Sequence, residues 1–177
     1  FFCISAVPEH PDPTLVDIDT PEIRDLLDNP PKHRWAGWDL YFEHFPIVNT
    51  ANGISRGRDE FRTMELWRNG YVELRTPIDQ RFCWGQNDQE FKKNPKCNPV
   101  AVSEYIVSFL RFYKELLHRV GYEQNAYLNI QFLDLRGFRM TSRSWTSEDS
   151  KPFTEKDYVI TDLQLRPGFD PETTAFN

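Results

Sequence analysis

Several features that would point to a definite class of function are scarce or missing in this 177-residue sequence. Cysteine is the first, since Cys3, Cys83 and Cys97 form an odd set with no C-x-x-C pair and no Cys/His cluster. Neither a disulfide framework nor a zinc site is therefore indicated. Free thiols fit a reducing compartment, so we expect a cytoplasmic protein without a metal or other cofactor.

Long apolar runs are also missing. The mean hydropathy is −0.64, and no run approaches the roughly 18 residues that a membrane helix needs, so we expect no membrane association. The first residues, Phe1 to Val7, are apolar but too short for a signal peptide, and they begin without Met. This beginning favours a fragment of a longer protein.

Positive charge is in short supply. The net charge is −6 and the isoelectric point is about 5.2. A broad nucleic-acid surface needs clustered Lys and Arg, so nucleic acid is not the favoured partner, although a local basic patch stays open.

Catalytic motifs are missing as well. No glycine-rich phosphate loop and no H-x-x-x-H pair occurs, and no serine lies in a nucleophile elbow. These absences favour a non-enzymatic protein. The alternative is an enzyme that acts on nucleic acid or a nucleotide, with acids such as Glu65 and Glu73 and several arginines converging from separate segments.

The elements that are present predict an α+β fold. Asn98 and Pro99 begin a helix, apolar residues recur every three or four positions to Val120, and Gly121 ends it. This pattern predicts a long amphipathic helix over residues 99–120. Thr20 and Pro21 begin a second, short helix over 21–28.

Strand patterns surround the two helices. Asn69-Gly70 predicts a two-residue hairpin turn that sets Trp67 opposite Val72 and Leu66 opposite Glu73. Further strands are expected over 1–7, 40–48, 126–135 and 158–165, with a surface loop over 85–98. We therefore expect a mostly antiparallel sheet with both helices packed on it, forming one domain over residues 1–166 and a polar tail over 167–177.

The stretch from His33 to Arg62 combines aromatic rings with cations, and such a combination can bind a nucleotide, a sugar or single-stranded nucleic acid. The same residues are explained more simply if the aromatic rings belong to the hydrophobic core and the charged residues surround them at the surface. The candidate ligand-binding residues are Trp35, Trp38, Tyr41, Arg56, Arg58, Arg62 and Trp67.

The hairpin sequence Glu65-Leu-Trp-Arg-Asn-Gly-Tyr-Val-Glu73 resembles a stretch found downstream of the Schlafen-type, Alba-like ATP-binding domain of many bacterial proteins. A strand ending at Pro8, Gly37-Trp38 after a short helix, the long helix, and a strand followed by Gly137 occur in the family's order. The ATP-binding domain itself is absent from this chain. The resemblance implies an accessory C-terminal module of a regulatory or defence protein, which senses a ligand, forms a homodimer or binds a protein partner.

Overall fold

The fold is that of a computed structural model, which describes residues 1–34, 37–40, 42, 45–58, 61–79, 82, 87–140 and 150–176. A seven-stranded sheet forms its centre, and every neighbouring pair of strands in it is antiparallel. The fold is therefore α+β, as the sequence predicts. In sheet order the strands are β2 (Ile47–Asn49), β3 (Gly53–Arg58), β4 (Arg62–Trp67), β5 (Val72–Thr76), β1 (Phe2–Pro8), β7 (Ala126–Phe132) and β9 (Tyr158–Leu165).

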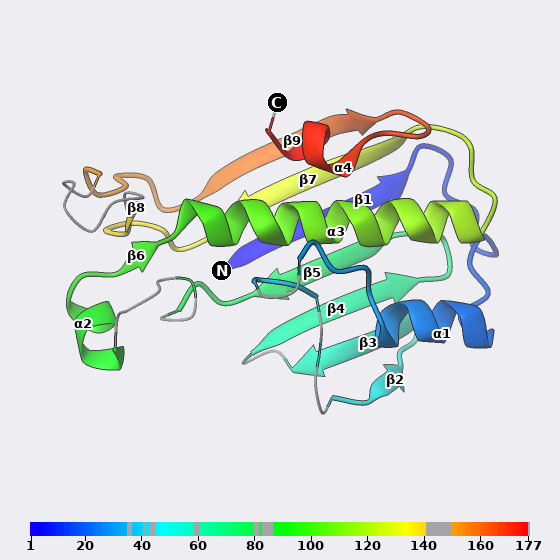
Figure 1. The fold of residues 1–177 in the computed structure, drawn as a ribbon, viewed down its shortest axis with the longest axis horizontal. Coiled ribbons are helices and arrows are strands. Elements are labelled where there is room, and N and C mark those ends of the chain that lie inside the picture. Colours follow the sequence, from blue (N-terminus) through cyan, green and yellow to red (C-terminus); the bar gives the residue numbers. More distant parts are fainter. Residues whose placement is uncertain are drawn as a thin grey trace.

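The long helix α3 (Pro99–Arg119) lies across one face of the sheet, and the short helices α1 (Pro21–Asp28) and α4 (Pro171–Phe176) flank it (Figure 1). The Asn98 side chain caps α3 by accepting from the Val100 amide at 2.9 Å. At the other end the Tyr122 amide donates to the Leu117 carbonyl at 2.9 Å, and Gly121 has a φ of +66°. Both predicted ends of the helix are confirmed. No described helix is long and apolar enough to cross a membrane.

The core lies between α3 and the central strand β1. Phe2, Ile4 and Ala6 alternate along β1 and are completely buried, as are Phe109 and Phe112 on the helix. Each of these side chains contributes roughly 1.5–3 kcal/mol through its removal from water, apart from the smaller alanine. This face of the sheet is called the helix-side face below, and the opposite one the polar face.

The hairpin of β4 and β5 has a different register from the predicted one. Leu66 pairs with Val72, and Glu65 pairs with Glu73. The reason is a longer turn, in which Gly70 has a φ of +83° and the Trp67 amide donates to the Tyr71 carbonyl at 2.9 Å. The predicted two-residue turn is therefore wrong. Shifting the register by one residue puts the aliphatic side chains of the hairpin on the helix-side face, namely Met64, Leu66, Val72 and Leu74.

Strand β9 also departs from simple alternation. The sequence predicts Val159, Leu163 and Leu165 on one face, but a bulge at Asp162, with a φ of +59°, changes the order. Ile160 pairs with Ile130 and Leu163 with Leu128, so both lie on the helix-side face, and Val159 lies on the polar face.

Two segments contain more helix or strand than the sequence predicts, and one contains less. The expected loop over 85–98 contains helix α2 (Asp88–Lys93), with a reciprocal capping box between Asn87 and Glu90, and strand β6 (Lys96–Cys97), which pairs with β8 (Arg139–Met140). The tail over 167–177 contains α4. The Arg111 guanidinium of α3 donates to the Glu172 carboxylate of α4, and this hydrogen bond lowers the pKa of Glu172. Of the strand expected over 40–48, only β2 is formed among the described residues. The division into one domain and a tail stays a prediction.

Replacing Gly70 by alanine should destabilise the fold strongly. The new Cβ would lie 2.7 Å from Pro8 Cγ and 2.8 Å from Leu15 Cδ2, and the positive φ adds strain of about 1–2 kcal/mol. Gly137→Ala is the matched control, because its φ is +88° but no atom lies within 4 Å of the new Cβ. We expect Gly70→Ala to lower the free energy of unfolding in urea by at least about 1 kcal/mol more than the control. Equal losses would contradict the close packing of this turn against Pro8 and Leu15.

Candidate functional site

Two of the seven predicted ligand-binding residues, Trp35 and Tyr41, lie outside the described residues, as does Cys83. Arg56 is described, and its side chain is buried. Its guanidinium donates to the carbonyls of Phe45 at 2.7 Å and Leu27 at 3.0 Å, and it lies 2.8 Å from the Asp28 carboxylate. These donors attach the end of α1 and the segment before β2 to strand β3.

Arg62 and Trp38 belong to the same group of attachments. The Arg62 guanidinium donates to the Asp39 carbonyl and to the Tyr105 hydroxyl of α3. The Trp38 amide donates at 2.9 Å to Glu104, a buried carboxylate of α3. The charged groups in this region therefore satisfy buried backbone, which is a structural use. Whether they also bind a ligand stays a prediction.

The remaining two candidates, Arg58 and Trp67, lie on opposite faces of the sheet. Arg58 follows Arg56 on the helix-side face, and its guanidinium lies 5.5 Å from the centre of the Phe45 ring. Trp67 alternates with Leu66 and so lies on the polar face. The structure thus gathers the described arginines and Trp38 on one side and separates Trp67 from them.

The polar face carries a network that the sequence did not reveal as a unit. Arg75 lies 3.0 Å from Glu65 and 3.0 Å from Glu73, two carboxylates on directly paired residues. The Tyr71 hydroxyl donates to Glu73 at 2.6 Å, and the Trp67 indole donates to Glu65 at 3.2 Å. Arg75 therefore offsets the repulsion that two facing acids would otherwise create.

This network contains no activated nucleophile among its described members. Burial, and next the nearby Glu73, raise the pKa of Cys3 to about 12, so its thiol is protonated at neutral pH. Burial, followed by the hydrogen bond to Glu73, also raises the pKa of the Tyr71 hydroxyl. Within the described part of the chain, no group of three or more His, Cys, Asp or Glu residues could hold a metal ion.

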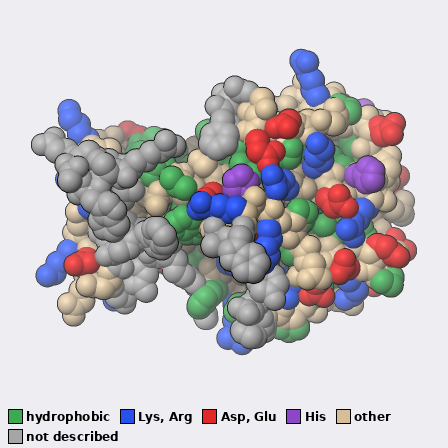
Figure 2. Space-filling view, in the orientation of Figure 1, with side chains coloured by type: hydrophobic (Ala, Val, Ile, Leu, Met, Phe, Trp, Pro, Cys, Tyr) green, Lys and Arg blue, Asp and Glu red, His purple; other side chains and the backbone are tan. Residues whose placement is uncertain are grey.

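Charge is mixed on the outer surface of the molecule that is seen from the side of α3. Figure 2 shows Lys and Arg side chains interspersed with Asp and Glu over its right-hand part. Mixed charge of this kind creates no broad potential of one sign, which a phosphate backbone would need.

The outer strand β9 is the most apolar exposed element in the described part of the chain. Its exposed fractions are 54% at Val159, 48% at Ile160 and 42% at Leu163. The strand has eight residues and a neighbour, β7, on one side. A long apolar edge strand is a template for pairing with another polypeptide. Sequence reasoning missed this site, although apolar residues at both odd and even positions were a signal for it.

No protein-family model matches the chain, and no curated protein and no solved structure is significantly similar to it. The resemblance to the region downstream of Schlafen-type ATP-binding domains therefore stays a prediction.

Replacing Arg56 by methionine should destabilise the fold, because two carbonyls and a carboxylate lose a charged donor. Hydrogen bonds to charged groups contribute roughly 1.5–3 kcal/mol each, so we expect a loss of about 2–4 kcal/mol in urea unfolding. Arg58→Met on the same strand is the control, because Arg58 is exposed, and should change stability by less than about 0.5 kcal/mol. A loss below about 1 kcal/mol for Arg56→Met would contradict the attachment role.

Proposed function

We propose that the chain is a non-enzymatic accessory module for protein assembly, which joins another polypeptide chain through the exposed strand β9. The observation that carries this proposal is the exposure of Val159, Ile160 and Leu163 on one edge strand. Apolar side chains gathered on one surface element are typical of interaction sites. The setting that we propose is cytoplasmic and regulatory, which the buried free thiols Cys3 and Cys97 support.

Strand addition at this edge would bury apolar surface on both faces of the sheet. Val159 lies on the polar face, whereas Ile160 and Leu163 lie on the helix-side face. Covering three half-exposed side chains would contribute roughly 1 kcal/mol each, in addition to the new backbone hydrogen bonds. The bulge at Asp162 interrupts the edge, so we expect a short pairing on either side of it.

The double substitution Ile160→Lys with Leu163→Lys should abolish association, because it places two charges in the apolar contact. Light scattering after size-exclusion chromatography, over a range of concentrations, would measure the change in mass. Pull-down with full-length bait would detect a partner other than a second copy. Val48→Lys is the matched control, because Val48 is 50% exposed on the opposite edge strand β2.

We expect the control to associate like the unchanged chain. A strict monomer that retains no partner in the pull-down would contradict the proposal. Equal loss for Val48→Lys and for the double variant would show that association depends on charge in general and not on β9.

The alternative is an enzyme acting on nucleic acid or a nucleotide, and one observation favours it. Glu65 and Glu73 converge on the polar face beside Arg75, although Arg75 pairs with both acids. Activity that vanishes in both Glu65→Gln and Glu73→Gln, with the fold retained, would replace the assembly proposal.

A further inference from the structure

A pocket of about 390 Å³ lies at the C-terminal end of α3. The last turns of α3, the turn that follows the helix, and the turn between β9 and α4 form its walls. Its volume falls within the range of about 300–1,000 Å³ that small-molecule sites occupy.

Basic side chains outnumber acidic ones in this pocket. Lys114, His118 and Arg166 line it, against a single acid, Glu123. None of the three basic residues forms an ion pair within the described part of the chain, whereas both arginines of α3 bind carboxylates. In a chain of net charge −6, Lys114 and Arg166 place two positive charges at the pocket. They lie beside the partially negative C-terminal end of α3, and Asp170 interacts electrostatically with Lys114.

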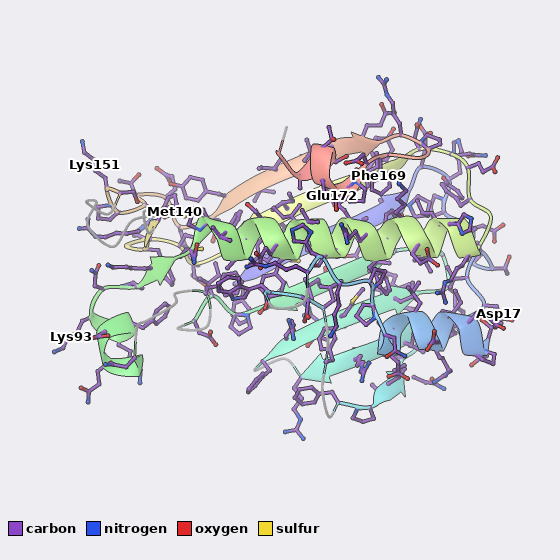
Figure 3. The ribbon with its side chains drawn as sticks, viewed as in Figure 1. Asp17, Lys93, Met140, Lys151, Phe169 and Glu172 are labelled. Carbon is purple, nitrogen blue, oxygen red and sulfur yellow. The ribbon has the colours of Figure 1, made fainter. Side chains whose placement is uncertain are left out.

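The apolar lining comes from Leu117, Tyr122 and Phe169. Leu117 is buried, and the two aromatic residues are half-buried. Figure 3 places Phe169 beside α4 and over α3, near Glu172. Aromatic and aliphatic surface next to cations suits a ligand that has an apolar body and an anionic group.

Hydrogen bonds within the chain hold the two turns that form the walls of the pocket. The Tyr122 hydroxyl accepts from the His10 amide at 3.2 Å and donates to the Asn125 carbonyl at 3.1 Å. The Phe169 amide donates to the Arg166 carbonyl at 3.1 Å, and Gly168 between them has a φ of +70°. Preformed walls reduce the ordering cost of binding.

We infer that this pocket binds a small organic anion, in which a carboxylate or phosphate group is attached to an apolar or aromatic body. Lys114 and Arg166 would hold the anionic group, and Tyr122 and Phe169 would contact the body. This site does not depend on the assembly proposal, because it shares no residue with the apolar contact of β9.

A titration of the isotope-labelled chain with naphthoate, followed by proton–nitrogen correlation NMR spectra of its amides, tests the inference. We expect the signals of Gly121 and Gly168 to shift with a dissociation constant of about 1 mM or below. Neutral naphthylmethanol and inorganic phosphate, which each lack half of the ligand, should bind at least about tenfold more weakly. The double variant Lys114→Gln with Arg166→Gln should lose about tenfold in affinity for naphthoate, or about 1.4 kcal/mol.

The matched control removes two cations elsewhere. Lys93→Gln with Lys151→Gln changes the net charge equally, and Figure 3 places both residues at the opposite end of the molecule from Phe169. This variant should bind naphthoate like the unchanged chain. All four side chains are exposed, so signals outside the pocket should report an intact fold.

Three results would overturn the inference. One is an absence of shifts at Gly121 and Gly168. Another is equal affinity for naphthoate and naphthylmethanol, which would mean that the cations do not contact the ligand. The third is an equal loss in both double variants, which would reduce the effect to net charge.

Discussion

The contact between helix α3 and strand β1 is the interaction on which the rest of the molecule depends. Three alternate side chains of β1 are completely buried, and the helix that covers them has 21 residues. Because β1 lies between β5 and β7, this contact fixes both halves of the sheet to one helix. Helices α1 and α4 both pack against α3.

Arginine side chains attach peripheral segments of the chain to the sheet and to α3. Arg56 binds carbonyls from two segments, Arg62 connects a carbonyl to α3, and Arg111 holds α4. A guanidinium has several donors in a rigid plane, so one side chain can satisfy carbonyls that no strand or helix reaches. The positions of Arg56 and Arg62 thus have a structural explanation in the carbonyls that they bind.

The sequence predicted those elements whose bounds depend on neighbouring residues, such as the long helix. The spacing of apolar residues and the caps at Asn98 and Gly121 determine α3, so its bounds were predictable. Helix α2 was missed although its capping box, Asn87 with Glu90, was readable in the sequence. Register was not predictable, because it depends on turn geometry at Gly70 and on a bulge at Asp162.

Sites were harder to predict than elements, because their residues meet across long separations. Arg56 has a carboxylate partner 28 positions earlier in the chain, at Asp28, and no spacing rule connects the two. The pocket at the end of α3 joins residues near 120 to residues near 167. In β9 the apolar residues at odd and even positions were a signal, but the place of the strand at the edge of the sheet depends on its pairing with the distant strand β7.

The central position of β1 also has a consequence for the order of folding. Residues 2–8 pair with residues 72–76 on one side and with residues 126–132 on the other. Contacts between such distant segments require large loops to close, which slows folding. During synthesis, Phe2 and Ile4 stay uncovered until residues 99–119 of α3 have emerged from the ribosome, and the second edge of β1 stays unpaired until residues 126–132 follow. The chain is therefore most vulnerable to aggregation before its long helix is complete.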